Sequence, residues 1–495
     1  MILAIILSIA ILVGFEAYFS STRPTTQSND LTNSKMTDDP APIPTENQSM
    51  QFDRIESSNI PSPLSEDTEV QVVTDLKRSD LLSNSQRIVI NTPRVDGSIS
   101  LIGGHIDDLS LRDYREDLES DSPEIVVLLP KGLNNAYYAG FGWVNAVNGA
   151  KLSLPNSETV WTANKKVLTT DSPVTLSWDN GEGLKFKKII SIDENYLFSV
   201  VQRVENFSSS SIALHGYGLI SRQTTPDVTG FFILHEGLLG VFNETLMEID
   251  YDDIQDQGTI EQSSKGGWIG ITDKYWLTAL VPSQNDNVNS RFIHRQENGI
   301  DRYQVDFLSH KIEIPIGDAR NIESYLFTGA KEVPLLDGYS ESLGIDRFDL
   351  TIDWGWFYFL TKPIFQALLW LNDRVGNLGI SILLLTIGIK IVFFPLANKS
   401  YVAMSKMKKL QPEMQKLREV YGDDKIKLNQ EMMSLYKREK ANPASGCLPI
   451  IIQIPVFFAL YKVLFVTIEM RHAPFFGWIQ DLSAPDPTTI FNMFG

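Results

Sequence analysis

The sequence has few of the residues on which metal and thiol chemistry depend. Its 495 residues include one cysteine, Cys447, and six histidines. A single thiol excludes an intramolecular disulfide. The histidines and carboxylates are not spaced as metal ligands, and neither a glycine-rich phosphate loop nor a nucleophile elbow is present. We therefore expect no metal and no small-molecule cofactor, and an inert membrane thiol at Cys447.

Positive charge is also scarce, and it is unevenly placed. The chain has 43 Lys and Arg against 61 Asp and Glu, which gives a formal net charge of −18. Residues 397–440 nevertheless hold 11 Lys and Arg against 6 Asp and Glu, or +5, so the rest of the chain sums to −23. Lys and Arg near the ends of membrane spans mark the cytoplasmic side. Because residues 397–440 directly follow an apolar run, we expect them to be cytoplasmic and the acidic bulk to lie outside.

Long apolar runs occur at both ends of the chain. Residues 1–20 predict an uncleaved N-terminal transmembrane anchor, and a cleaved signal peptide is the alternative. Residues 377–397 and 444–468 are each long enough to cross a bilayer, which takes about 20 residues. Residues 349–374 combine many aromatics with apolar positions three and four apart, which predicts an amphipathic helix on the outer membrane surface.

The middle of the chain shows β patterning instead. Residues 86–335 contain short apolar runs separated by turns, including a hairpin signal at residues 179–183, and no sustained helical period. They predict one large β-sandwich. Residues 21–85 are rich in polar residues and proline, and they predict a disordered tether. Because large β-sandwiches often bind sugars, a membrane-anchored periplasmic carbohydrate-active or sugar-binding protein is the alternative function. It would need a histidine and a carboxylate in one cleft.

Three polar side chains interrupt the two later spans. Lys390 lies within 377–397, and Thr386 precedes it by four residues and so shares its helix face. Gln453 lies within 444–468 beside two prolines. A charge inside a span needs a partner, a water-filled cavity or an escape to the interface. We expect the three side chains to line one polar groove. For Lys390, snorkelling to the interface is the other interpretation.

Between these spans, residues 398–441 predict a charged helical hairpin. Met407, Leu410, Met414 and Leu417 repeat with heptad spacing, and Pro412 is expected to kink the first helix. The basic surface suits docking of a ribosome, anionic lipid or a partner protein, whereas a solvated connection is the simpler interpretation. The candidate docking cations are Lys406, Lys408, Lys409, Lys416, Arg418, Lys437 and Arg438.

Several motifs resemble one family, the YidC membrane protein insertases of Gram-negative bacteria, within the YidC/Oxa/Alb superfamily. The resemblance covers nearly the whole chain and is weakest in the tether. The matching segments include Leu350-Thr351-Ile352-Asp353-Trp354-Gly355-Trp356, Met404-Ser405-Lys406-Met407, Gly446-Cys447-Leu448-Pro449, Trp478-Ile479-Gln480-Asp481-Leu482-Ser483-Ala484 and, in the β region, Ser263-Ser264-Lys265-Gly266-Gly267-Trp268.

The resemblance implies a multi-pass α-helical inner-membrane protein with a large periplasmic all-β domain, a β-supersandwich, and a cytoplasmic helical hairpin. It implies a non-enzymatic insertase and membrane chaperone for nascent integral membrane proteins, acting alone or with the Sec translocon. In such proteins a basic groove residue attracts the acidic tail of an incoming protein. Lys390 matches that position, where much of the family has arginine, and Thr386 and Gln453 match groove positions.

Two departures from the family pattern concern the ends of the sequence. Residues 469–495 are expected to form a periplasmic loop, after which the family continues with further spans. The short polar tail that usually precedes the first anchor is also missing. We therefore expect the sequence to be a truncated chain.

Overall fold

The computed structural model describes residues 77–119, 121–147, 152–228, 230, 233–422, 424–439, 441 and 448–484. The predicted anchor at residues 1–20 and most of the predicted tether lie outside these residues. The described residues fall into two compact units, one within 388–454 and the other within 77–387 and 455–484. Each unit is described by itself.

The β region forms two large sheets. An 11-stranded sheet has the order β14-β17-β18-β11-β5-β3-β2-β1-β7, with β19 and β4 beside this path. Its strands are β1 (Arg87–Asn91), β2 (Val95–Ser100), β3 (Ile106–Arg115), β4 (Glu124–Leu128), β5 (Tyr137–Asn145), β7 (Val167–Leu168), β11 (Ile212–Gln223), β14 (Thr259–Lys265), β17 (Asn287–Glu297), β18 (Ile300–Ser309) and β19 (Ile312–Ile314).

The second sheet has nine strands in the order β13-β12-β15-β16-β20-β10-β9-β8-β6. The last strand of the sheet in the sequence, β20, therefore lies near its middle, between β16 and β10. The strands are β6 (Thr162–Ala163), β8 (Val174–Asp179), β9 (Leu184–Ile192), β10 (Leu197–Asn206), β12 (Gly237–Phe242), β13 (Thr245–Asp250), β15 (Trp268–Thr272), β16 (Trp276–Val281) and β20 (Ala319–Ala330).

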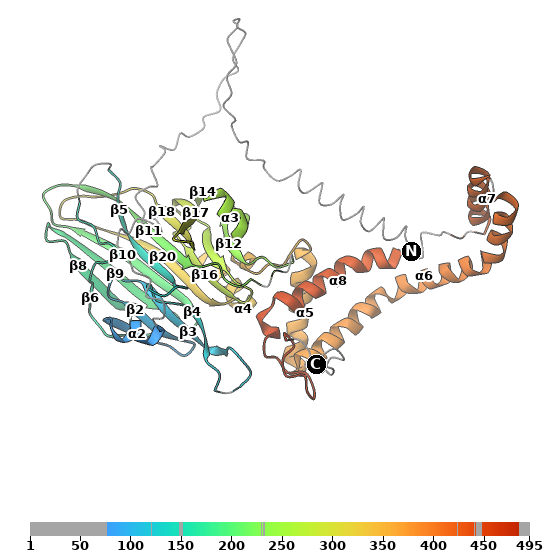
Figure 1. Cartoon of the computed structure of the whole chain (residues 1–495), viewed down its shortest axis with the longest axis horizontal. Coiled ribbons are helices and arrows are strands. Elements are labelled where there is room, and N and C mark those ends of the chain that lie inside the picture. Colours follow the sequence, from blue (N-terminus) through green and yellow to red (C-terminus); the bar gives the residue numbers. More distant parts are fainter. Residues whose placement is uncertain are drawn as a thin grey trace, which may run out of the picture. The chain divides into compact units, whose positions relative to one another are not determined.

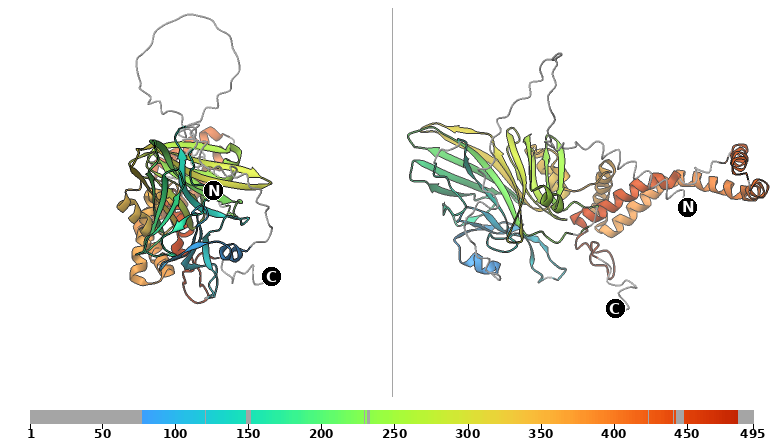
Figure 2. Two further views of the ribbon diagram at one scale, coloured as in Figure 1. Left: turned by 90° about the vertical axis from the view of Figure 1, so that its left-hand side faces the viewer. Right: turned by 45° about the horizontal axis from the view of Figure 1, so that its top comes forward.

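Alternating side chains explain how the sheets pack. Along β9 the burial alternates from residue to residue, so that Leu184, Phe186 and Ile190 face inward. The two sheets lie in layers (Figures 1 and 2), and Phe292 and Phe307 of the 11-stranded sheet are likewise fully buried. The β-rich fold predicted for residues 86–335 is therefore present.

The predicted hairpin at residues 179–183 is confirmed. Strands β8 and β9 pair antiparallel, with Asp179 opposite Lys185. Gly181 and Gly183 adopt φ angles of 75° and 91°, which side chains disfavour. The Asn180 carboxamide oxygen accepts hydrogen bonds from the backbone N–H groups of Glu182 and Leu184 at 2.8 and 3.0 Å, so the turn is held by its own side chain.

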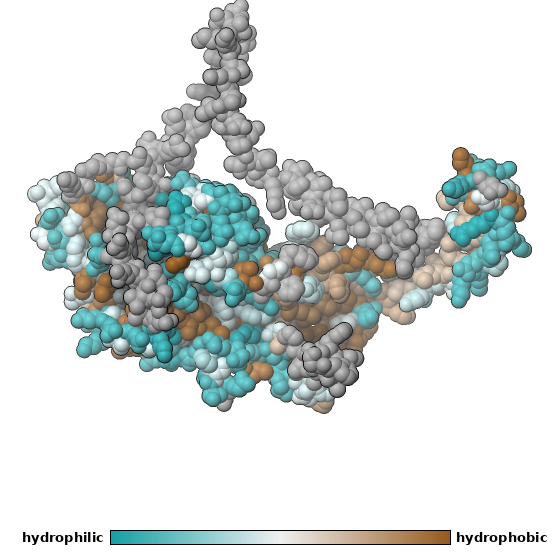
Figure 3. Space-filling view, viewed as in Figure 1, coloured by the Kyte–Doolittle hydropathy of each residue, from teal (hydrophilic) through white to brown (hydrophobic). Residues whose placement is uncertain are grey.

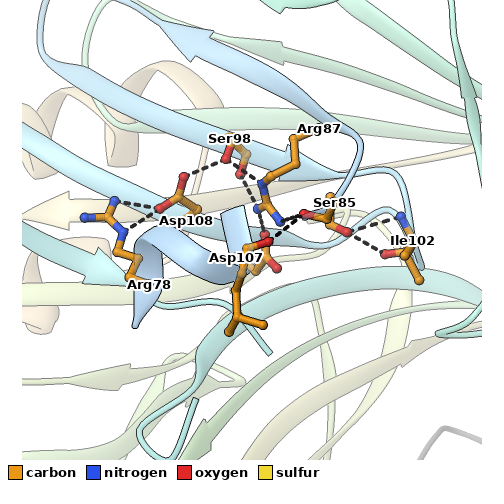
Figure 4. Close-up of polar contacts among 9 residues, drawn as sticks. Arg78, Ser85, Arg87, Ser98, Ile102, Asp107 and Asp108 are labelled. Carbon is orange, nitrogen blue, oxygen red and sulfur yellow. Dashed lines mark hydrogen bonds and ion pairs between the residues drawn. The ribbon is translucent and has the colours of Figure 1, made fainter. Parts of the chain in front are cut away.

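Ordered structure begins before residue 86, which corrects the end of the predicted tether. Residues Arg78–Ser83 form the short helix α2. Arg78 reaches from it to the buried carboxylate of Asp108 on β3, with Nη2 and Oδ1 2.6 Å apart (Figure 4). Ser98 donates to the other oxygen of Asp108 at 2.6 Å. The charge pair thus fastens α2 to the β domain, a contact that the local polar composition did not indicate.

Short helices accompany the sheets. They are α3 (Tyr251–Gln257), α4 (Val333–Leu343) and the 3-10 turn η2 (Phe348–Thr351). The amphipathic helix α5 spans Tyr358–Val375, so it begins later than the predicted residue 349. Its buried residues are Thr361, Ile364, Phe365 and Leu368, and it exposes Phe359 and Trp370. The helix is therefore amphipathic, as predicted, and it ends at Gly376, whose φ is 69°.

The remaining helices are α6 (Leu378–Tyr421), α7 (Lys425–Arg438) and α8 (Leu448–Val466), followed by the 3-10 turn η4 (Ile468–Met470). We predicted a span at 377–397 and a separate hairpin helix after it, but α6 is one helix of 44 residues. Good helix formers predominate in residues 397–421 and Pro412 lies inside the helix, and the first glycine after this segment is Gly422. By length and composition, α6 and residues Pro449–Val466 are apolar enough to cross a membrane.

Candidate functional site

The structure places the three predicted groove residues on α6 and α8. Thr386 donates a hydrogen bond from Oγ1 to the carbonyl oxygen of Ile382 at 2.8 Å, within its own helix. Lys390 and Gln453 are exposed, and no hydrogen bond or ion pair joins either to another residue in the described part of the chain. The groove itself therefore stays a prediction.

The surroundings of Lys390 are strongly apolar. Ile391 and Val392, which follow Lys390 on α6, are 66% and 74% exposed. On α8, taken by itself, Phe457 is 66% exposed. Figure 3 shows apolar surface on both helices. Large apolar side chains at this exposure are unfavourable in water but are normal for a helix that faces lipid. Lys390 is a cation on this apolar surface, where a charge is unfavourable unless it reaches water or a partner, so its presence indicates a functional role.

The hairpin formed by the end of α6 and by α7 packs as the heptad spacing predicted. Leu410, Leu435 and Ala441 are buried together. Three further apolar residues of the predicted seam pack against this group: Met407, Met414 and Leu417. Asp424 begins α7 by accepting hydrogen bonds from the backbone N–H groups of Ile426 and Lys427 at 3.1 and 3.0 Å.

All the candidate docking cations are exposed on this hairpin: Lys406, Lys408, Lys409, Lys416, Arg418, Lys437 and Arg438. Within the described residues Arg438 alone among them forms an ion pair, with Glu413 at 3.0 Å and Glu439 at 3.1 Å. The hairpin also exposes Ile426 and Val420, which are 75% and 69% accessible. Exposed cations beside exposed apolar residues form a surface suited to an anionic partner.

A further cation, Lys462 on α8, has a defined partner that the sequence analysis missed. Its Nζ lies 2.6 Å from Oδ2 of Asp353 and also donates to the carbonyl oxygen of Ile233. Asp353 accepts two more hydrogen bonds, from the backbone N–H groups of His235 and Gly355, each at 3.0 Å. The signal was a lone lysine in an apolar stretch, which needs a partner just as Lys390 does.

Other contacts join the end of α8 and the residues after it to the β domain. Arg471 donates from Nη2 to the carbonyl oxygens of Arg115 and Glu116, at 2.6 and 3.0 Å. Lys274 lies 4.1 Å from the ring centre of Phe465. Burial raises the pKa of Glu469 to about 7. We call Asp353, Lys462, Glu469 and Arg471, with their partners, the α8 junction. It fixes the last part of α8 to the β domain.

Close packing continues at the start of α6. Asn377 donates from its carboxamide to the carbonyl oxygen of Phe475 at 2.8 Å. A Cβ atom placed on Gly379 would lie 2.1 Å from the Phe475 ring, so no larger residue fits there without displacing that ring. The first turn of α6 and Phe475 therefore pack directly on each other.

The sugar-active alternative required a histidine and a carboxylate in one cleft. A cavity of about 440 Å³ is lined by His310 and Asp286, but their nearest charged atoms are 3.9 Å apart and both side chains are more than 40% exposed. His294 and His235 contact Asp301 and Asp250 at 2.9 and 3.0 Å. No group of three metal-binding side chains occurs among the described residues. The last two pairs do not line this cavity, and the side chains of His310 and Asp286 that do are too far apart for a hydrogen bond.

Comparisons with known proteins agree with the membrane helices and the β domain. The family model described as "YidC periplasmic domain" matches residues 87–367, and "60Kd inner membrane protein" matches residues 370–494. A Rickettsia bellii protein named "Membrane protein insertase YidC" is 50% identical over 414 residues, covering 83% of this chain and 74% of its own. A protein of the same name from Beijerinckia indica is 51% identical over 425 residues, covering 85% and 70%.

Among solved structures, one titled "Active YidC insertase crystal structure with the first transmembrane domain resolved" is 18% identical, with a TM-score of 0.31, covering 81% of this chain and 77% of that one. The two family models together extend over both the β domain and the helices, and the two relatives are about half identical to this chain over the aligned residues. The chain therefore belongs to the YidC family of membrane protein insertases.

Proposed function

We propose that this chain inserts integral proteins into the bacterial inner membrane and helps them to fold, without turnover of a small molecule. The observation that carries the proposal is the 50% identity to the Rickettsia bellii insertase over 414 residues. The chain is an inner-membrane protein whose large β domain is periplasmic, in agreement with both family descriptions. Its substrates are membrane proteins, and the lipid bilayer is its medium.

We place insertion at a polar groove that contains Lys390, Thr386 and Gln453. An acidic tail that enters the membrane loses hydration, and a nearby cation offsets part of that cost. Opposite charges about 4 Å apart attract by about 4 kcal/mol at an effective dielectric constant of about 20. Lys390 is exposed and has no ion pair within the described residues, which supports a role in attracting the tail.

The topology we propose is multi-pass, with the α6–α7 hairpin in the cytoplasm. The surplus of positive charge in residues 397–440 supports this orientation. On that side, the exposed hairpin cations are suited to bind a ribosome through its RNA phosphates. The Sec translocon is the other partner we propose, because the family resemblance implies action either alone or beside it.

The charge of Lys390 provides the decisive test of the groove. We expect Lys390→Arg to retain insertion, since the charge is kept, and Lys390→Glu to impair it for clients with acidic periplasmic tails. Clients with neutral tails should be less affected. Insertion is measured by protease protection of radiolabelled clients in vesicles that contain the full chain.

A matched control is Lys399→Glu, which makes the same charge change at an exposed position of the same helix, outside the predicted span. It should leave the contrast between acidic and neutral tails as in the wild type. Normal insertion of acidic-tailed clients by a folded Lys390→Glu variant, present at the wild-type level, would contradict the groove.

Orientation is tested separately with single cysteines at position 424 or 180 in a Cys447→Ser background. An impermeant thiol reagent added to spheroplasts should label Asn180→Cys and not Asp424→Cys. The reverse pattern would refute the topology, and it would leave the Lys390 experiment to be judged on its own result.

A further inference from the structure

One cavity of the β domain has a chemistry that insertion does not use. Its floor is the face of the 11-stranded sheet that presents Tyr138 of β5, Ser221 of β11 and Gln304 of β18. These three residues lie in one row, because Ser221 is paired in register with both of the others. The strands are neighbours in Figure 1. Residues 155–157 and Trp161 form a wall, and the cavity volume is about 60 Å³.

The cavity is cationic, although the whole chain has a net charge of −18. Lys131, Lys188 and Arg302 line it, and no carboxylate is found among the described residues of its lining. His105 is also part of the lining, and burial together with the nearby lysines lowers its pKa to about 3, so it is neutral at pH 7. Arg302 also pairs with Glu297 at 3.4 Å, a residue outside this lining. A lining that contains cations and no carboxylate favours a negatively charged occupant.

Lys188 is the most informative of these cations. It is only 2% exposed, on β9 of the second sheet. Its Nζ donates to the carbonyl oxygen of Gly103 at 3.0 Å and lies 4.7 Å from the ring centre of Trp161. Within the described residues it has no salt bridge to a carboxylate. Burial lowers the pKa of Lys188 to about 7. Near pH 7 the amine is therefore only partly protonated, because its charged form is buried without a counter-ion, and a bound anion would stabilise that form.

Trp161 supplies an independent sign of a missing partner. Its side chain is 2% exposed and lines the cavity, and its Nε1 is buried without a hydrogen-bond acceptor among the described residues. Buried indole N–H groups usually have an acceptor. An oxygen atom of a ligand in the cavity would provide one.

The neutral part of the lining identifies the class of ligand. It contains hydroxyl and carboxamide groups, which both donate and accept hydrogen bonds as the hydroxyl groups of a sugar require. It also contains tyrosine and tryptophan rings, whose faces suit the C–H groups of a sugar ring. These residues are Tyr138, Asn156, Ser157, Trp161, Tyr217, Ser221, Gln223 and Gln304. A volume of about 60 Å³ limits the ligand to a small molecule.

We propose that this cavity binds a small polyhydroxylated anion of the size of one sugar ring, either a sugar acid or a sugar phosphate. Lys188 and Arg302 would contact the carboxylate or phosphate, Trp161 would donate to one of its oxygens, and the carboxamides would contact the hydroxyl groups. The site shares no residue with the proposed insertion groove, so a bound ligand would contact only the β domain.

Calorimetric titration of the full chain in detergent tests this binding. The probes are D-glucuronate and D-glucose 6-phosphate, which distinguish the two kinds of anion, with D-glucose and acetate as partial probes. We expect at least one of the two anions to bind at millimolar concentration or below, about tenfold more tightly than either partial probe. Equal binding of D-glucose or acetate, or no binding of either anion at millimolar concentration, would overturn the proposal.

Variants then locate the bound anion. Lys188→Met removes the buried charge, and Arg302→Gln removes a charge from a side chain that is 33% exposed and therefore easier to replace without unfolding. Each should weaken anion binding about tenfold. The matched control Lys311→Ala removes an exposed lysine that lines the other cavity and should leave binding unchanged. If folded Arg302→Gln bound the anion as the wild type does, with an unchanged melting temperature, the assignment would be wrong.

Discussion

The β domain and the membrane helices use the same kinds of residue in opposite ways. In the β domain, phenylalanines such as Phe198 and Phe327 are fully buried between the sheets. On α6 and α8, Ile391, Val392 and Phe457 are more than 60% exposed. The first group is stabilised by removal from water, whereas the second needs lipid as its solvent. Apolar composition alone therefore does not distinguish a buried core from a lipid-facing surface, whereas the spacing of apolar residues along the chain does.

Charges show the same contrast. Asp306 in the β domain is completely buried, and Arg291 donates to its two oxygens at 2.9 and 2.8 Å. Lys390 on α6 is exposed and has no ion pair among the described residues. A buried, fully paired charge supports the fold, whereas an exposed charge in an apolar surface is available to a substrate. Four substitutions test this distinction.

Asp306→Ala should have the largest effect. It leaves the Arg291 guanidinium buried without its carboxylate, and breaking one side of a buried pair costs about 3–5 kcal/mol of folding free energy. Denaturant unfolding of the full chain, followed by tryptophan fluorescence, measures the loss. Asp318→Ala is the control, because Asp318 pairs with Arg320 at 2.5 Å but both side chains are more than 40% exposed. Equal stability of the two variants would remove the contrast drawn above.

Lys462→Met should have the next largest effect, about 2–3 kcal/mol. It removes the partner of Asp353 in the α8 junction but leaves the two backbone hydrogen bonds to that carboxylate. We expect faster hydrogen exchange at the His235 amide, which donates to Asp353 at 3.0 Å. Asp353→Asn combined with Lys462→Met should cost less than the sum of the two single changes. Unchanged exchange at His235 would show that the pair does not hold the junction.

Glu469→Gln should stabilise the junction, and the effect should depend on pH. The pKa of Glu469 is raised from 4.5 to about 7 in the folded protein, so the folded state binds more protons between these values. Its contribution to stability is therefore full below pH 4.5 and is lost as the pH rises through 7. At pH 8 the glutamine should raise stability by about 2 kcal/mol, and at pH 5 by much less. If Glu469→Gln raised the melting temperature equally at pH 5 and at pH 8, the raised pKa of Glu469 would not be the reason for the gain.

Arg438→Ala should have the smallest effect, about 0.5 kcal/mol or less. Its ion pair with Glu413 is 3.0 Å long, but the two side chains are 64% and 53% exposed. Leu435→Ala on the same helix is the comparison, because it truncates a buried side chain and should cost about 2 kcal/mol or more. Loss of the helical circular-dichroism signal of the hairpin during thermal unfolding measures the stability of both variants. A larger loss for Arg438→Ala would mean that its charge, and not the apolar seam, holds the hairpin.

Local patterns predicted much of this structure. The 179–183 hairpin followed from its Asn-Gly turn, and the seam around Leu435 followed from the heptad spacing, because both depend on residues close in sequence. The continuous α6 was missed, because the span was ended at residue 397, where the apolar run gives way to charged residues, although helix formers continue beyond it. The Lys462–Asp353 pair and the cationic cavity join residues far apart in the chain, and no local pattern specifies such contacts. Whether Lys390, Thr386 and Gln453 share a groove stays a prediction.

Because β20 lies in the middle of the nine-stranded sheet, that sheet cannot be completed until β20 has joined it. β20 pairs with β16 on one side and with β10 on the other. The β10 residues that pair with it lie more than 100 positions earlier in the sequence. Without β20 the nine-stranded sheet is in two pieces. Pairings between such distant segments form slowly. Completion of the nine-stranded sheet therefore depends on one of the last strands of the domain in the sequence, Ala319–Ala330.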